Sequence, residues 1–192
     1  LGAGRLNAVY IHTAFFGAIS LPLAGALLSA IGLAAAPEAA LRRAERALWL
    51  WNASLAIAVL AMLLLGPWGM RPEVWAAAPA LADGLLWVAA LLWAWALWSI
   101  ASHIPPPLPV ATWFGLAAAV GLLLYLGLGL VLSATMAGAN QALAGAMYQR
   151  GLTVLWAAPA ALGLAAAILS GTVRAPLFGR RAILLGLAGW VA

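Results

Sequence analysis

The chain of 192 residues is 67% hydrophobic and only 7% charged. A water-soluble domain of this size cannot bury so much apolar surface, so the composition predicts an integral membrane protein. Its net charge of +5 is set by nine arginines against four acidic residues. In a membrane protein such a charge reports orientation, so we expect no nucleic-acid partner. The absence of cysteine excludes disulfides, thiolate metal sites and iron-sulfur clusters within these residues.

The first apolar span is predicted from Asn7 to Ala36, with a kink at Pro22. It carries His12 one or two turns inside its first end. An imidazole in an apolar helix must find a hydrogen-bond partner, a metal or a cofactor to offset its lost hydration. Two interpretations of His12 stay open at this point: a histidine bonded to a neighbouring helix, and the ligand of a cofactor.

Four further spans follow, each close to or above the roughly 20 residues that cross a bilayer. They are predicted at Leu48–Gly66, Ala80–Ile100, Val110–Met136 and Met147–Ser170, the last with a second kink at Pro159. Ala182 to Ala192 would be only the start of a sixth, so we expect the sequence to be a piece of a longer polypeptide. The sequence therefore predicts one all-α transmembrane domain over residues 1–192, with five complete transmembrane helices and a truncated sixth.

The connections between the spans are polar or rigid. The alanine-rich segment Pro37–Ala47 carries three arginines and predicts a short interfacial helix or a helical turn. Ser102–Pro109 contains a triple proline and cannot be helical, and Gly138–Ala146 is expected outside the membrane. Trp49 and Trp51 are expected at the membrane interface, while the tryptophans of the third span are expected to serve packing and anchoring rather than cofactor binding.

The arginines are unevenly divided between the two sides of the predicted bundle. Six lie in the segments Pro37–Ala47 and Gly171–Arg181, against three on the opposite side. The positive-inside rule therefore places the N-terminal end outside, in what we expect to be the inner membrane of a bacterium. His12 then lies near the outer face and His103 near the inner one, so the two histidines cannot share a metal.

Four short motifs occur in order along the chain. They are Gly4-Arg5-Leu6 before His12-Thr13, Glu73-Val74-Trp75, His103-Ile104 before Thr112-Trp113-Phe114, and Arg174-Ala175-Pro176-Leu177-Phe178 before Arg181. Their order and spacing resemble subunit I of the haem-copper oxidases, most of all the cbb-type (C-family) cytochrome c oxidases, with the nitric oxide reductases as near relatives. The resemblance implies that the predicted helices correspond to helices two to seven of that family's bundle.

The resemblance gives three of these residues a role. His12 would be an axial ligand of a low-spin haem b, Arg5 would pair with a haem propionate, and Glu73 would help to hold calcium near the propionates. The family's activity is cytochrome c oxidation with oxygen reduction and proton pumping. The resemblance therefore implies partners among the membrane subunits of a respiratory complex and cytochrome c-type subunits, within the lipid bilayer.

The copper site is where the sequence departs from the family. Counted back from Pro176, the family's element with a copper-binding histidine falls on Tyr148–Leu155, and Arg150 takes the place of that histidine. A protonated guanidinium cannot coordinate copper. An interfacial arginine that serves no cofactor is the alternative interpretation of Arg150. A complete oxidase site needs histidines for two haems and a copper ion, and this chain has only two, so we expect no copper from this segment.

Three functions stay open from the sequence. The first is a respiratory electron-transfer subunit that resembles cytochrome c oxidase subunit I and holds at most a low-spin haem b through His12. The second is a non-catalytic scaffold or assembly subunit of a respiratory complex. The third is an oxygen or nitric oxide reductase subunit whose metal site lies in helices outside these residues. No catalytic residue is assigned, and a transporter is disfavoured because paired ionisable residues at mid-membrane are lacking.

Overall fold

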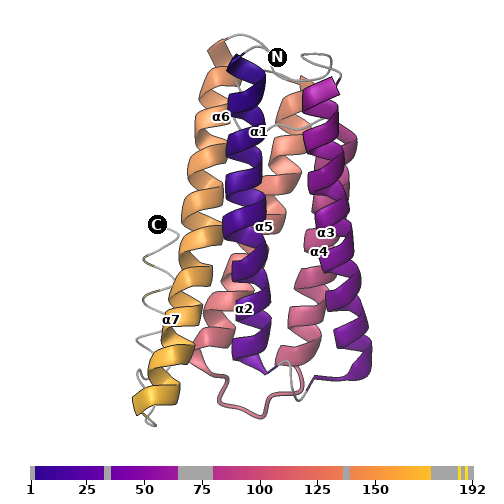
Figure 1. The fold of residues 1–192 in the computed structure, drawn as a ribbon. Helices are drawn as coiled ribbons and strands as arrows, with labels where there is room; N and C mark the ends of the chain where they lie inside the picture. The colour runs from indigo at the N-terminus through magenta and orange to yellow at the C-terminus, as the bar shows by residue number, and fades with distance from the viewer. Residues whose placement is uncertain are drawn as a thin grey trace.

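The computed structural model describes residues 3–32, 36–64, 80–135, 139–173, 186 and 189. Within these residues the structure is helical apart from short connections, and it contains no strand. The helices, of which η1 and η3 are π-helical, are α1 (Ala3–His12), η1 (Thr13–Ser20), α2 (Leu21–Ile31), α3 (Glu38–Leu64), α4 (Ala80–Ala101), α5 (Val110–Thr135), α6 (Ala139–Gly151), η3 (Leu152–Ala157) and α7 (Ala158–Val173). Figure 1 shows α1 and α2 in one continuous rod, α6 and α7 in another, and an upright bundle formed with α3, α4 and α5.

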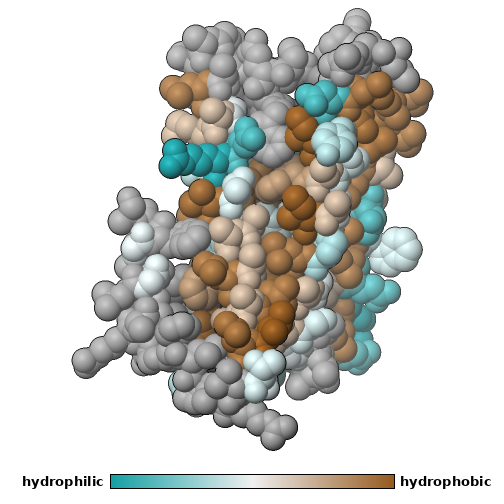
Figure 2. Space-filling view, turned by 60° about the vertical axis from the view of Figure 1, so that its left-hand side comes forward, coloured by the Kyte–Doolittle hydropathy of each residue, from teal (hydrophilic) through white to brown (hydrophobic). Residues whose placement is uncertain are grey.

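Five helical stretches are long and apolar enough to cross a bilayer, namely Val9–Ile31, Glu38–Leu64, Leu81–Ala101, Val110–Val131 and Gly145–Thr172. The five predicted spans are thereby confirmed, and the chain is a multi-pass membrane protein. Figure 2 shows brown and pale side chains over most of the described flank, with hydrophilic colour in small groups. The predicted sixth span lies outside the described residues apart from Gly186 and Gly189, and the correspondence with the oxidase bundle stays a prediction.

The arginine-rich segment Pro37–Ala47 is not a separate interfacial helix, and that prediction is wrong. α3 runs uninterrupted over Glu38–Leu64, so the three arginines occupy the first turns of a 27-residue helix. The physical reason is the spacing of small side chains. Ala40, Ala44 and Ala47 are buried and extend the buried stripe of the apolar half of the helix. One continuous helix buries the whole stripe, whereas a break would expose part of it.

The segment Gly138–Ala146, expected outside the membrane, is helical from Ala139. α6 passes from there without a break through η3 into α7. The segment is rich in alanine and contains no proline, so nothing in its sequence stops a helix. Its position relative to a bilayer stays a prediction, but it is part of the last membrane-crossing rod rather than a separate connection.

Pro22 and Pro159, the two predicted kink positions, each follow a π-helical segment. η1 ends at Ser20, two residues before Pro22, and η3 ends at Ala157, two residues before Pro159. Proline donates no N–H bond, and its ring crowds the preceding turn. A π-helical segment with i→i+5 bonds accommodates such a defect inside a continuous helix. The predicted kinks at Pro22 and Pro159 stay predictions, and the structure shows a π-helical segment just before each proline.

α3 and α4 pack along a seam of small side chains. On α3 the buried residues recur every three or four positions, at Ala40, Ala44, Ala47, Trp51, Ser54, Ala58 and Met62. On α4 the buried residues include a set at the same spacing, namely Ala82, Leu86, Ala89, Trp93, Ala96 and Ile100. This spacing is typical of helices that pack side by side, and alanine lets the two backbones approach closely. The hydroxyl of Ser54 donates to the carbonyl oxygen of Ala82 across the seam, at 2.7 Å.

α5 and the last rod interlock through glycines. The Tyr125 ring of α5 lies against Gly151, and the Tyr148 ring of α6 lies against Gly129, so that a Cβ at either glycine would overlap the facing ring. A Cβ at Gly121 of α5 would overlap backbone atoms of η3. Close approach of this kind strengthens helix packing where no hydrophobic driving force exists. The interface therefore requires glycine, which has no side chain, at these three positions. It fixes the register of the last rod on α5.

Candidate functional site

His12 is the last residue of α1 and lies in the interior of the bundle. Its side chain is fully buried, with 0% of its surface exposed. The centroid of its imidazole is 4.9 Å from that of the Phe16 ring, and Phe16 contacts Phe15 edge to face at 5.0 Å. The predicted place of His12 inside an apolar helix is confirmed. Because a buried imidazole can hold haem iron or bond a neighbouring helix, both interpretations of His12 stay predictions.

Three tryptophans brace the rod that carries His12. Each donates its indole N–H to that rod: Trp51 of α3 to the Phe16 carbonyl oxygen at 3.1 Å, Trp93 of α4 to the Ala24 carbonyl oxygen at 3.2 Å, and Trp156 of η3 to the Ser20 hydroxyl at 2.9 Å. We call Trp51, Trp93 and Trp156 the inner tryptophans, and none is more than 1% exposed. They tie three different helices to the first rod and fill the interior next to it.

The inner tryptophans correct one prediction from the sequence. Trp51 was expected at the membrane interface beside Trp49, but it is buried, whereas Trp49 is 71% exposed. Residues two apart on a helix point about 200° away from each other, so one position faces the bundle and the other faces out. The signal was present in the sequence, because Trp51 continues the three-and-four spacing of the buried stripe and Trp49 does not. The packing role expected for the third-span tryptophans is confirmed for Trp93.

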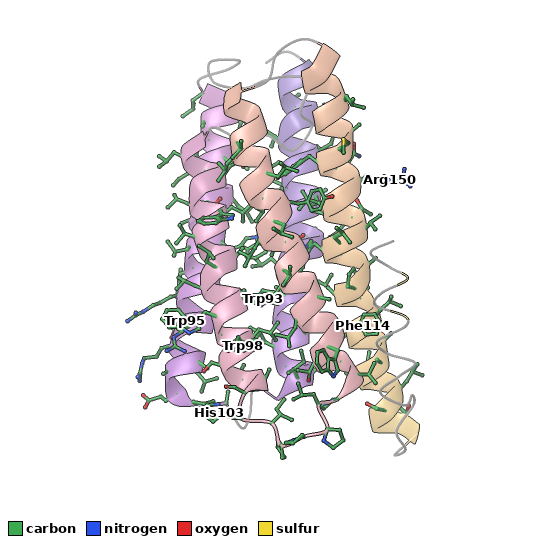
Figure 3. The ribbon with its side chains drawn as sticks, turned by 180° about the vertical axis from the view of Figure 1, so that it is seen from behind. Trp93, Trp95, Trp98, His103, Phe114 and Arg150 are labelled. Atoms are coloured by element: carbon green, nitrogen blue, oxygen red, sulfur yellow. The ribbon has the colours of Figure 1, made fainter. Side chains whose placement is uncertain are left out.

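His103 lies far from this interior, in the connection that follows α4. Its side chain is exposed, and its Nδ1 lies 2.7 Å from the carbonyl oxygen of Ser99 and 3.3 Å from the hydroxyl of Ser102. Since a carbonyl oxygen only accepts, Nδ1 is the donor in the shorter bond. Figure 3 shows His103 at the end of the bundle opposite the N-terminus of Figure 1. The two histidines therefore cannot share a metal, as the sequence predicted.

Arg150 does not face the interior of the bundle. Its side chain is exposed, and Figure 3 shows it pointing outward from the last turn of α6. The position that the resemblance aligns with a copper-binding histidine thus carries a cation turned away from the bundle. Tyr148, two residues earlier, is the side chain that turns inward. Both interpretations of Arg150, as the residue in the copper position and as an arginine that serves no cofactor, stay predictions.

The two other predicted site residues are Arg5 and Glu73. Arg5 belongs to α1, but its side chain lies outside the described part of the chain, and Glu73 lies outside the described residues altogether. Their expected roles at a haem propionate and at calcium stay predictions. Among the described residues, no group of three or more histidine, cysteine, aspartate or glutamate side chains lies close enough together to hold a metal ion.

The histidines of the described residues fit a haem and do not fit an oxidase-type copper ion. A buried imidazole on an apolar helix suits an axial haem ligand, and His12 meets that description. A copper ion of the oxidase type needs several imidazoles at one point. The described residues offer none beside His12, and Arg150 points away. They therefore fit at most one haem ligand and do not fit the copper site.

Comparisons with models of protein families, with curated proteins and with solved structures find no match. The class of the protein accordingly follows from its own fold, which is that of an α-helical, multi-pass membrane protein with five membrane-crossing helices in its described part. Its interior is formed by alanine seams, three bonded tryptophans and one buried histidine.

Proposed function

We propose that this chain belongs to a membrane subunit that resembles subunit I of the cbb-type cytochrome c oxidases and takes part in respiratory electron transfer. In this proposal the segment holds at most one low-spin haem b, through His12. The observation that carries the proposal is the complete burial of the His12 imidazole inside an apolar, membrane-crossing helix. The order of the four oxidase-like motifs along the chain supports it.

The neighbours of His12 provide what an axial haem ligand requires, which is a fixed imidazole in a dry environment. The aromatic contact with Phe16 limits rotation of the imidazole, and the Trp51 bond to the Phe16 carbonyl positions the turn from which Phe16 projects. The apolar helices around them exclude water. A haem b, when bound, would supply one-electron transfer, with a potential raised by this dry environment. Arg5, at the start of the same helix, would neutralise a propionate.

The remaining parts of the proposal concern the setting of this segment. Two histidines occur in the chain and His103 is exposed at the far end, so a second axial histidine would come from outside these residues. We place the chain in a bacterial inner membrane with its N-terminal end outside, because its arginine-rich α3 begins at the opposite end. Other membrane subunits of a respiratory complex and cytochrome c-type subunits would be its partners, and Glu73 would hold calcium.

Oxygen reduction is not assigned to these residues. Arg150 would leave the copper position without a ligand, and the described residues gather no metal-binding group around it. An oxygen or nitric oxide reductase activity would depend on helices outside this segment.

The test is a reduced-minus-oxidised visible spectrum of the purified full-length membrane protein, with metal analysis of the same sample. The proposal predicts the bands of a six-coordinate b-type haem and no copper. Two haems together with copper would instead show that outside helices complete a reductase. A protein that binds no haem would contradict the proposal and leave the scaffold function.

A scaffold or assembly subunit is the second candidate, and one observation favours it. The inner tryptophans fill the interior beside the first rod and donate hydrogen bonds to it, and Trp93 and Trp156 are in edge-to-face contact at 5.3 Å between ring centroids. Such a filled and hydrogen-bonded centre is what a purely structural bundle needs. In that case the His12 imidazole would serve helix packing, and removal of His12 would lower stability without changing any spectrum.

A further inference from the structure

A cluster of arginines and tryptophans lies on the outer flank of α3 and α4, toward the His103 end. Arg42 and Arg46 are exposed one turn apart on α3, and Arg43 reaches across to α4. The guanidinium carbon of Arg43 lies 4.0 Å from the centroid of the Trp95 ring. Figure 3 shows Trp95 and Trp98 on one flank, with nitrogen-bearing side chains pointing outward beside Trp95.

The cluster has cations that its own acidic groups do not neutralise. Arg42 forms an ion pair with Glu38 one turn earlier on the helix. Arg43 and Arg46 form no ion pair with the described residues, and neither does Glu45, which is exposed on the same helix. The Trp95 ring contacts one face of the Arg43 guanidinium, which leaves the N–H groups at its edge available to an acceptor. The cluster therefore presents two guanidinium groups to its surroundings, of which that of Arg43 is held against the Trp95 ring.

Three exposed indole rings lie on the same two helices as these guanidinium groups. Trp49, Trp95 and Trp98 are 71%, 56% and 63% exposed, and we call them the outer tryptophans. Exposed tryptophan on a membrane protein prefers the boundary between headgroups and acyl chains. The arginines occupy the first turns of a membrane-crossing helix, so they lie near one end of the span, where headgroup phosphates are found. The arrangement is complementary in charge and in polarity to an acidic lipid.

We propose that this patch, formed by Arg42, Arg43, Arg46 and the outer tryptophans, binds the phosphate of an anionic phospholipid. Arg43 and Arg46 donate to the phosphate oxygens, for which a guanidinium offers two parallel N–H groups. The outer tryptophans lie beside the glycerol and upper acyl chains. Arg42 stays paired with Glu38, so Arg43 and Arg46 carry the charge that attracts the phosphate. The site is independent of His12 and of any haem.

The test measures binding of phosphatidylglycerol and phosphatidylcholine to the purified full-length protein by native mass spectrometry. We expect phosphatidylglycerol to bind more tightly. Arg43→Gln and Arg46→Gln should each weaken its binding about fivefold, since one basic residue near the surface contributes about 1 kcal/mol. Arg150→Gln removes an exposed arginine away from the patch and should leave the affinity unchanged. Circular dichroism of each variant checks that the helices are intact.

Two further variants separate a built site from general attraction. Trp95→Leu changes no charge but frees the Arg43 guanidinium, so binding should fall about two- to fivefold. Glu45→Gln removes a nearby negative charge and should tighten binding about fivefold. Unchanged affinity in Trp95→Leu, or an equal loss in Arg150→Gln, would overturn the proposal in favour of unspecific charge attraction. Equal binding of phosphatidylcholine, or complete displacement of the lipid by inorganic phosphate, would overturn the assignment to an anionic phospholipid.

Discussion

The inner and outer tryptophans show opposite uses of the same side chain within one bundle. Trp49 and Trp51 are two residues apart on α3, and Trp93 and Trp95 are two residues apart on α4, yet one member of each pair is buried and the other exposed. The inner rings donate N–H bonds to the first rod, while Trp95 lies under an arginine. Helical direction, rather than residue type, decides which use a tryptophan has.

The amino-acid composition of a helix in such a bundle says little about which of its residues face the interior. In a bilayer the outward face of a helix meets lipid that is as apolar as the protein core, so hydrophobic residues occur on both faces. Bulky apolar and aromatic side chains therefore occur on both faces, and what the interior adds here is closely packed alanine and hydrogen bonds between helices. Polar groups such as the Ser20 hydroxyl find partners there.

The largest expected effect comes from truncating an inner tryptophan. Trp51→Ala removes a buried ring and the donor to the Phe16 carbonyl, so the free energy of unfolding in detergent should fall by about 3 kcal/mol or more. Trp49→Ala, two residues away on the exposed face, should change it by less than about 0.5 kcal/mol. Equal losses in the two variants would break the distinction between inner and outer positions.

A smaller effect is expected when only the indole N–H is removed. Trp156→Phe keeps an aromatic ring but removes the donor to the Ser20 hydroxyl, and should cost about 1 kcal/mol of unfolding free energy. A double-mutant cycle with Ser20→Ala measures the bond itself. The second substitution should cost little once the first is present. Fully additive losses would show that the bond contributes nothing to stability.

The smallest change concerns spectroscopy rather than stability. Lipids brominated on their acyl chains quench tryptophans that contact the bilayer. Replacing the outer tryptophans by phenylalanine should remove a large share of the quenchable emission, because these rings are exposed on the flank of the bundle. Replacing the inner tryptophans should lower total emission and leave the quenchable part unchanged. Quenchable emission that falls only when the inner tryptophans are replaced would contradict the assignment of the two groups to the inner and outer faces.

Much of the fold could be predicted from the sequence, because length and apolarity of the spans are physically required in a bilayer. The predicted helix boundaries that proved wrong lie in alanine-rich segments. Alanine suits a connection, an interfacial helix and a membrane seam alike, so the alanine-rich composition did not predict that α3 extends through the arginine-rich segment. The spacing of these alanines held the information, and composition alone did not.

The candidate site was predictable only in part. The burial of His12 follows from its place in an apolar span and is confirmed. The hydrogen bonds of Trp51, Trp93 and Trp156 join residues far apart in the sequence, so no local pattern could pair them. The outward direction of Arg150 depends on the rotation of α6 about its axis, which glycine contacts with α5 set. Such rotations are a property of packing between helices rather than of one helix.

The central claim is that His12 holds a b-type haem, and a matched pair of histidine variants tests it most directly. His12→Ala removes the buried imidazole, and His103→Ala removes the exposed one at the other end of the bundle. Haem absorbance per protein should disappear or become five-coordinate in His12→Ala and stay unchanged in His103→Ala, with helix content equal by circular dichroism. An unaltered haem spectrum in a folded His12→Ala protein would contradict the claim.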